Sequence, residues 1–194
     1  MVTPAILKRF FDKAEPFAVY LSHAKPHERP GWDGLVARAK LSAEQRAVIA
    51  TFSRTMHVLC ISGTWCGDCV QQVPILLRIA EAKPLTNGAG IDLRFLEREA
   101  NLELADMVQI CGGRRVPTVI FMNEDHEFVS LLGDRTLARY RAIAASSLGP
   151  ACPMPGAPLP DDQMAATTQD WVNEFERVAL LLRLSAKLRE RHGD

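Results

Sequence analysis

Four short segments along the chain have the hydrophobic pattern of β-strands. Residues 57–62 form a mostly apolar run, which is typical of a buried strand. Residues 91–96 alternate in polarity, which predicts a strand that is covered only in part. Residues 118–122 and 127–132 predict two further strands, and the polar segment between them indicates a hairpin.

Apolar residues at helical spacing predict helices on both sides of these strands. The first follows Thr3-Pro4, since proline is favourable in a first turn, and Pro16 ends or kinks it. A capping box at Ser42 and Gln45 starts another helix, which we expect to end near Arg54. Further helices are predicted at residues 66–83, 101–110, 136–147 and 163–191. Residues 26–34, with two prolines and two glycines, predict a loop.

The last predicted helix has an unusually broad apolar surface. Trp171, Phe175, Val178 and Leu182 form one stripe, and a second stripe consists of Leu180, Leu184 and Leu188. Such a surface must be covered, either by the chain's own domain or by a second copy in a homodimer. Residues 149–162 precede this helix, and their five prolines and two glycines predict a linker or an extended wrap.

Composition narrows the class of protein. The 23 basic residues balance 23 acidic ones among 194, so nothing indicates nucleic acid or an anionic membrane as partner. The first residues do not resemble a secretory signal, and no segment approaches about twenty apolar residues. Five scattered cysteines are unlike a secreted disulfide framework, so we expect a cytoplasmic protein.

The segment Trp65-Cys66-Gly67-Asp68-Cys69 carries the clearest chemistry. It places two thiols two residues apart, between a predicted strand and a predicted helix. That spacing is typical of a redox motif, because one helical turn brings both sulfurs within bonding reach. Cys66 then lies near the helix N-terminus, where the unpaired N–H groups favour a thiolate. Structural zinc needs four ligands, and no second cysteine pair has matching spacing, so we predict no metal site.

Three further features strengthen this interpretation. Trp65 precedes the first cysteine, Pro74 lies in the helix behind the second, and Val116-Pro117-Thr118 opens a later strand. With the β-α-β-α-β-β-α order, these features resemble the thioredoxin superfamily over roughly residues 42–148. The resemblance implies an α/β fold with a central mixed four-stranded sheet flanked by helices.

The resemblance also implies roles for individual residues. Cys66 is then the attacking cysteine, Cys69 the resolving one, and Pro117 a cis-proline that faces them. Gly133 matches a glycine lining the same groove. The remaining groove residues are Trp65, Gly67, Val116 and Thr118. Since the backbone at Val116 faces the motif, an extended substrate is expected to pair there as an added strand.

A narrower likeness involves the flanking helices. Residues 73–82 and 101–104, with the Trp-Cys-Gly-Asp core, resemble a bacterial thioredoxin-like family that carries a helical N-terminal extension. The chain accordingly divides into an extension at 1–41, a thioredoxin-like domain at 42–148, a linker at 149–162 and a C-terminal helix at 163–194.

The motif departs from ordinary thioredoxin at three positions. Asp68 replaces the proline that usually lies between the cysteines. Cys60 replaces the buried acid expected six residues before Cys66, and Ser62 replaces the tryptophan expected shortly after that acid. The missing acid leaves the proton acceptor of Cys69 unassigned, with Asp68 or water as candidates. An ionised Asp68 opposes the Cys66 thiolate, so we expect it to make the site more reducing.

Other residues near the motif allow two interpretations each. Arg114 and Arg115, beside Pro117, are either a solvated pair or a contact for an anion such as glutathione. Cys60 fits a small buried apolar residue. Cys111 is either inert or a regulatory thiol. Cys152 is either inert or an oxidisable thiol.

We therefore predict a cytosolic thiol–disulfide oxidoreductase that reduces disulfides through Cys66 and Cys69. It needs no cofactor beyond that redox-active disulfide, and its substrate is a disulfide-containing protein or a small thiol, with the electron donor unassigned. The alternative is a thioredoxin-fold binding or redox-sensing module without general reductase activity.

Overall fold

The computed structural model describes residues 2–147 and 162–194, and a four-stranded sheet lies at its centre. The strands are Thr55–Ser62 (β1), Gly90–Glu97 (β2), Thr118–Met122 (β3) and Phe128–Gly133 (β4). Their order is β2-β1-β3-β4, with β1 parallel to β2 and antiparallel to β3, and β3 antiparallel to β4. The predicted mixed four-stranded sheet is confirmed.

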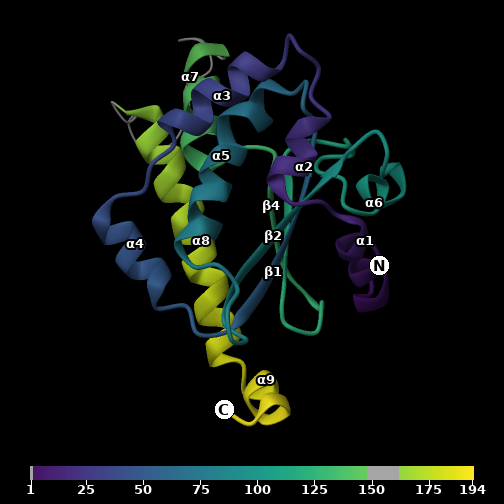
Figure 1. Ribbon diagram of the computed structural model, residues 1–194, viewed down its shortest axis with the longest axis vertical. Helices are drawn as coiled ribbons and strands as arrows, with labels where there is room; N and C mark the ends of the chain where they lie inside the picture. The colour runs from purple at the N-terminus through teal and green to yellow at the C-terminus, as the bar shows by residue number, and fades with distance from the viewer. Residues whose placement is uncertain (1, 148–161) are drawn as a thin grey trace.

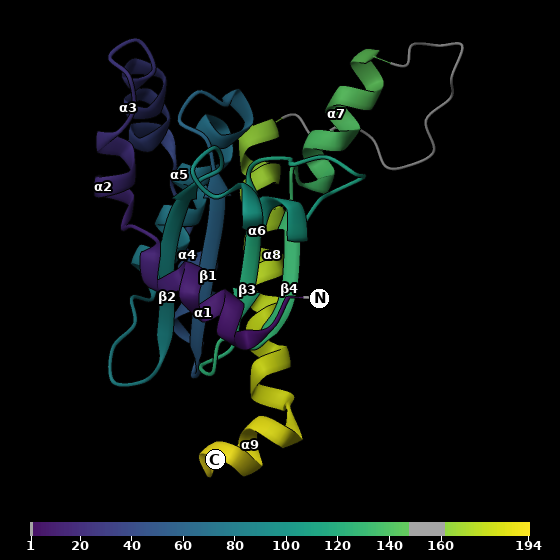
Figure 2. The same ribbon diagram turned by 90° about the vertical axis from the view of Figure 1, so that its right-hand side faces the viewer.

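Helices cover both faces of this sheet. Those before β1 are Pro4–Lys13 (α1), Phe17–Ser22 (α2), Arg29–Arg38 (α3) and Ala43–Ala50 (α4). Those after β1 are Gly67–Ala82 (α5), Leu102–Met107 (α6), Leu137–Ser147 (α7), Gln163–Leu184 (α8) and Ala186–His192 (α9). α4, α5 and α8 lie on one face, while α1 crosses the other (Figures 1 and 2). Both central strands are therefore buried on two sides, which explains their continuous apolar runs.

The loop predicted at residues 26–34 is wrong, because α3 begins at Arg29. Pro30 occupies the first turn, where a missing N–H removes no helical hydrogen bond. Trp32 is fully buried, and its Nε1 donates to the Thr64 carbonyl at 2.8 Å. Burial of this large side chain outweighs the low helix propensity of the glycines on either side.

Two other helices are shorter than predicted. α4 begins with the expected capping box at Ser42 and Gln45 but ends at Ala50, four residues before Arg54. Arg54 is buried and paired with Glu124 and Asp194, so the chain must leave the helix to place it there. α6 ends at Met107, because the backbone turns back at residues 110–113 and has positive φ at 111 and 112.

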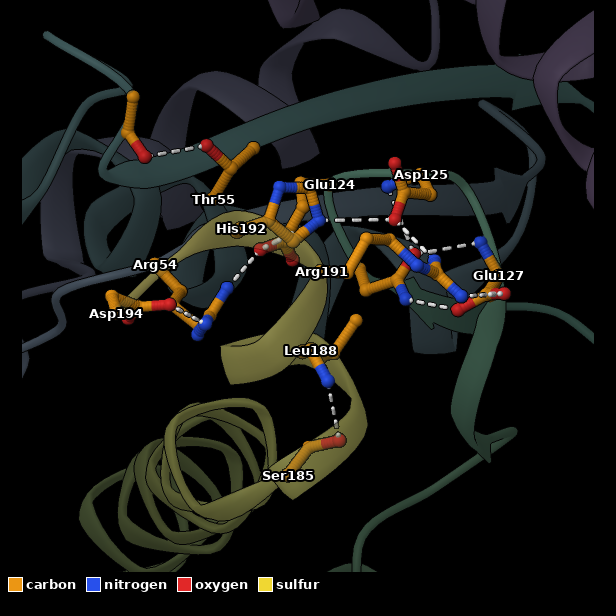
Figure 3. Close-up of polar contacts among 12 residues, drawn as sticks. Arg54, Thr55, Glu124, Asp125, Glu127, Ser185, Leu188, Arg191, His192 and Asp194 are labelled. Atoms are coloured by element: carbon orange, nitrogen blue, oxygen red, sulfur yellow. Dashed lines mark hydrogen bonds and ion pairs between the residues drawn. The ribbon is translucent and has the colours of Figure 1, made fainter.

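The predicted C-terminal helix is two helices, α8 and α9. Ser185 has extended backbone angles, and its Oγ accepts from the Leu188 N–H at 3.3 Å, which caps α9. The new helix is anchored to the β3–β4 hairpin (Figure 3). Arg191 contacts Asp125 at 2.5 Å and Glu127 at 3.2 Å. These ion pairs turn the chain toward the hairpin.

The long helix α8 packs on the chain's own domain through the first predicted stripe. Its residues Trp171, Phe175, Val178 and Leu182 are all 0 % exposed. Of the second stripe, Leu188 is buried in α9, whereas Leu180 and Leu184 are exposed. A homodimer through this helix stays a prediction. The linker predicted at 149–162 and Cys152 lie outside the described residues, apart from Asp162, whose side chain caps α8.

His57 on β1 lies beneath α1 in an aromatic cluster. Its ring stacks on that of His126 at 4.3 Å and lies 4.8 Å from the ring of Phe11. Burial and the neighbouring His126 lower the pKa of His57 from 6.5 to about 4, with Asp92 acting in the opposite direction. His57 is therefore neutral in the folded protein at pH 5, where the unfolded chain would protonate it.

We expect this histidine to reduce stability under acidic conditions. Between pH 6.5 and pH 4 the unfolded state binds the extra proton, so the free energy of unfolding falls as the pH falls, by up to about 3 kcal/mol. The measurement is urea unfolding from pH 7 to pH 4 for the wild type and for His57→Phe. The variant should lose less stability across this range, and parallel curves for the two proteins would contradict the prediction.

Candidate active site

The two cysteines lie where β1 passes into α5. β1 ends at Ser62, a three-residue connection follows, and Cys66 is the N-cap of α5, with its N–H donating to the Gly63 carbonyl at 3.0 Å. A Cβ at Gly63 would lie 2.7 Å from Cε2 of Trp65, so a larger residue there would displace the Trp65 ring. The N-cap position directs the unpaired N–H groups of the first helical turn toward the Cys66 sulfur.

Cys66 is a half-buried thiol whose surroundings favour its ionised form. The largest favourable influence on its pKa is hydrogen bonding by the Cys69 thiol, followed by that of the backbone N–H groups of Cys69 and Asp68. Together they lower the pKa of Cys66 from 9.0 to about 6, against the opposing effects of burial and of the Asp68 charge. When protonated, the same thiol reaches the Val116 carbonyl at 3.6 Å.

Cys69 has the opposite character. It lies on α5 with no exposed surface. Burial raises its pKa well above 9.0, the neighbouring Cys66 adds to this, and a hydrogen bond from Ser62 partly offsets it. The pair therefore consists of one accessible thiolate and one hidden thiol. This division suits attack by Cys66 and later attack by Cys69.

The segment before β3 faces the cysteines. The Val116–Pro117 peptide bond is cis, and the Val116 carbonyl points to Cys66. Thr118 is buried, and its Oγ1 donates to the Arg115 carbonyl at 2.7 Å. Gly133 pairs with Thr118 across β3 and β4, so close to the loop that a Cβ would lie 2.4 Å from the Pro117 carbonyl oxygen. The structure thus brings together all these predicted groove residues.

Trp65 and Gly67 complete the surface around Cys66. The Trp65 ring is 48 % exposed, and its Nε1 donates to Glu97 at 3.3 Å. The Arg98 guanidinium lies over the ring at 4.5 Å from its centroid. A Cβ at Gly67 would meet nothing within 4 Å, so the space beside this residue is open.

The structure does not support Asp68 as the proton acceptor. Its two carboxylate oxygens are held by Arg135 at 2.5 Å and Arg139 at 2.7 Å. Its charge still acts on Cys66, in the predicted direction, but two cations from the end of β4 and from α7 offset it. Local spacing does not indicate this pairing, because the arginines lie 67 and 71 residues away.

Replacing Asp68 with asparagine is expected to lower the pKa of Cys66 below about 6. The change removes the like charge and releases the two arginines, and both effects favour the thiolate. We expect a shift of less than about one pKa unit, together with a more oxidising disulfide. Thiolate absorbance against pH and redox titration with glutathione measure the two quantities. A pKa that is unchanged or raised would refute the repulsion argument.

Arg114 and Arg115 contact two different carboxylates, and an anion contact at these residues stays a prediction. Arg114 is exposed and pairs with Asp106 at 2.6 Å, while Arg115 contacts the buried Asp134 at 3.3 Å. Both predicted cations are thus paired with carboxylates. Cys60 is fully buried in β1, where burial strongly raises its pKa, and Cys111 is exposed.

Sequence reasoning missed several residues that support the site. Tyr20 donates to Ser62 Oγ at 2.8 Å, and Trp32 donates to the Thr64 carbonyl. Gln72 is fully buried, and its amide donates to the Asp134 carbonyl at 2.9 Å. These contacts span between 32 and 62 positions, so local spacing could not have indicated them.

The described residues contain no cluster of three or more histidine, cysteine or acidic side chains placed to hold a metal ion. Within residues 2–147 and 162–194, every helix is too short or too polar to span a bilayer.

Comparison with solved structures shows the fold. A protein of unknown function from Pseudomonas aeruginosa matches with a TM-score of 0.65 and 16 % identity, over 92 % of this chain and 97 % of that one. The crystal structure of an HIV epitope-scaffold matches with a TM-score of 0.60 and 17 % identity, over 95 % of this chain and all of that one. No curated protein matches the sequence.

A family model described as thioredoxin matches residues 14–143. The match begins inside the predicted N-terminal extension and includes β1 to β4, both cysteines and Pro117. Since the match spans more than half of the chain, this protein belongs to the thioredoxin family.

Proposed function

We propose that this protein is a thiol–disulfide oxidoreductase that reduces disulfides through Cys66 and Cys69. The observation that carries the proposal is the contrast between the two thiols. Cys66 is accessible with a pKa of about 6, so it is largely a thiolate at neutral pH, while Cys69 is buried and protonated. A thiolate attacks disulfides, and a neighbouring thiol resolves the product.

The proposed reaction has two exchange steps. The Cys66 thiolate attacks one sulfur of the substrate disulfide, a Cys66–substrate bond forms, and the other sulfur leaves with the bonding electrons and takes up a proton. Cys69 then loses its proton and attacks the Cys66 sulfur. The Cys66–Cys69 disulfide forms, and the second substrate sulfur leaves as a thiolate. The substrate gains two electrons and the protein dithiol loses them.

The surroundings of Cys66 favour a peptide substrate in extended form. The Val116 carbonyl faces the reactive sulfur, and the adjoining Trp65 ring is exposed, which would suit backbone pairing beside an apolar contact. We place the activity in the cytoplasm, where thiols are kept reduced. We also assign the chain to the narrower group marked by the Trp-Cys-Gly-Asp core.

The test is reduction of insulin by dithiothreitol in the presence of the protein. The protein should accelerate precipitation of the insulin chains, and a sample alkylated at Cys66 by iodoacetamide at pH 6.5 should not. Alkylation of Cys66 is feasible because its pKa of about 6 makes it largely a thiolate at that pH. Equal rates with and without the protein would favour the alternative, a binding or redox-sensing module.

A further inference from the structure

Arg98 joins two parts of the surface around Cys66. It follows β2 directly, and its N–H donates to the Ser62 carbonyl at 2.8 Å, which fixes its backbone to the end of β1. Its guanidinium lies 4.5 Å from the centroid of the Trp65 ring, and its Nη1 donates to the Arg114 carbonyl at 3.0 Å. One side chain thus contacts both the segment that leads into α5 and the loop that leads into β3.

All three guanidinium nitrogens of Arg98 have a partner. Nε and Nη2 bond Glu99, and Nη1 bonds the loop carbonyl. Arginine suits this position, because a planar guanidinium can bond several oxygens while it contacts an aromatic ring. An ion pair as exposed as Arg98–Glu99 contributes little to stability. The contacts of Arg98 therefore affect the local geometry more than the stability of the fold.

Trp65 is the tryptophan whose position depends on such a contact. Trp32 and Trp171 are fully buried, whereas Trp65 is 48 % exposed in the short connection between β1 and α5. Its Nε1 donates to Glu97 at 3.3 Å, and Arg98 lies over its ring. An exposed side chain that must be ordered when a partner binds weakens the binding. Arg98 reduces that loss by ordering the ring beforehand.

The Arg114 carbonyl belongs to the other side of the same surface. Two residues further along, the Val116 carbonyl accepts from Cys66 Sγ at 3.6 Å. The Arg114 side chain is itself paired with Asp106 at the end of α6, at 2.6 Å. Arg98 therefore links the Trp65 ring to a loop that is also fixed from α6.

We propose that Arg98 is a positioning residue that holds Trp65 and the Val116 backbone in register for an extended peptide disulfide. This inference rests on the proposed function and makes Arg98 a determinant of substrate choice. A peptide that reaches both contacts binds better when their separation is fixed in advance. A small disulfide that reaches only the Cys66 sulfur gains nothing from this arrangement.

The experiment compares two disulfides that differ only in the peptide around the cysteine. The first is a short peptide of threonine and valine with one central cysteine, which is joined to thionitrobenzoate. The second is N-acetylcysteine amide joined to the same group. The Cys66 thiolate attacks the cysteine sulfur, a new disulfide forms, and thionitrobenzoate leaves as a coloured thiolate with the bonding electrons. Stopped-flow absorbance gives both second-order rate constants for reduced protein in which Cys111 and Cys152 are replaced by serine.

Arg98→Met is expected to lower the ratio of the peptide rate constant to the amide rate constant about fivefold, the scale of an exposed cation–π contact and a backbone hydrogen bond. The amide rate constant and its pH profile should stay unchanged. Arg98→Lys should give an intermediate ratio, because an ammonium group can cover the ring but lacks the fork that also reaches the Arg114 carbonyl.

Arg94→Met is the matched control. Arg94 lies on β2, bonds Asp92 at 3.1 Å and lies 4.9 Å from the Phe11 ring centroid, so it has the same kinds of contact away from Cys66. Its rate ratio should equal that of the wild type. Quenching of tryptophan fluorescence by acrylamide should increase in Arg98→Met but not in Arg94→Met, because Trp65 is the exposed tryptophan.

The outcomes separate this inference from the proposed function. A rate ratio in Arg98→Met equal to that in Arg94→Met would refute the positioning role, and so would an equal fall in both rate constants. If the unsubstituted protein reacts with neither disulfide faster than a free thiol does, the proposed function is refuted. Acrylamide quenching still decides in that case whether Arg98 holds Trp65. Arg98→Lys decides the question if Arg98→Met fails to fold.

Discussion

Replacing Cys69 with serine is expected to stop turnover and leave the protein joined to its substrate by a disulfide. Cys66 keeps its helix-terminal N–H contacts in this variant, so the first exchange still proceeds. The second cannot, because the buried thiol that should attack the Cys66 sulfur is gone. Insulin reduction should fall to the uncatalysed rate. A covalent adduct that dithiothreitol releases should appear on non-reducing gels and in mass spectra.

Cys66→Ser is the matched variant for this experiment. It should be equally inactive but should form no adduct, since the accessible nucleophile is absent. Cys111→Ser serves as the positive control, because Cys111 is exposed on the loop before Arg114 and outside the pair. Adduct formation by Cys66→Ser to the same extent as by Cys69→Ser would show that another thiol reacts, and would refute the assigned roles.

Replacing Gly133 with alanine is expected to destabilise the fold by about 3 kcal/mol, at the upper end of the usual cost of overpacking. The added Cβ would lie 2.4 Å from the Pro117 carbonyl oxygen and 3.1 Å from the Thr118 Cα. Both atoms belong to the backbone, so neither can move aside as a flexible side chain would. The strand pair β3–β4 or the Pro117 loop must shift, and the second choice moves the Val116 carbonyl away from Cys66.

Urea unfolding measures the stability, and thiolate absorbance against pH measures the effect on Cys66. Gly34→Ala is the control, because this residue lies in α3 and a Cβ there would meet nothing within 4 Å. It should stabilise the protein by up to about 1 kcal/mol, as expected for glycine in a helix. A Gly133→Ala protein as stable as the wild type would show that the close approach at Pro117 is unimportant.

The sheet and the main redox pair follow from local pattern. β1 and β3 are central strands that are covered on both faces of the sheet. A strand buried on both faces has a continuous apolar run, which can be recognised in the sequence. The spacing of Cys66 and Cys69 is also local, because one helical turn fixes it. Helix α3 was missed because its formation depends on the burial of Trp32, which the local glycines and prolines do not reveal.

The supporting contacts of the site could not be read from local spacing. Asp68 is an unusual charge in the motif, but its partners Arg135 and Arg139 are brought to it only by the packing of α7 against α8 and of α8 against α5. Ser62 was noticed as a departure from thioredoxin, whereas Tyr20, its donor, is 42 positions away. Such pairs depend on how the helices and strands pack against one another. The hydrophobic periodicity of the sequence does not specify that packing.

The place of Tyr20 and Trp32 has a consequence for any attempt to shorten this protein. A fragment starting at residue 42 would keep both cysteines and the whole sheet. It would therefore contain every sequence motif by which the redox site is recognised. It would, however, lose the cover over Ser62 and the donor to the Thr64 carbonyl. Water would then reach the buried side of the Cys66–Cys69 pair and compete for the hydrogen bonds there. The difference in pKa between the two thiols would become smaller. The smallest redox unit of this chain therefore includes the segment that precedes the first strand.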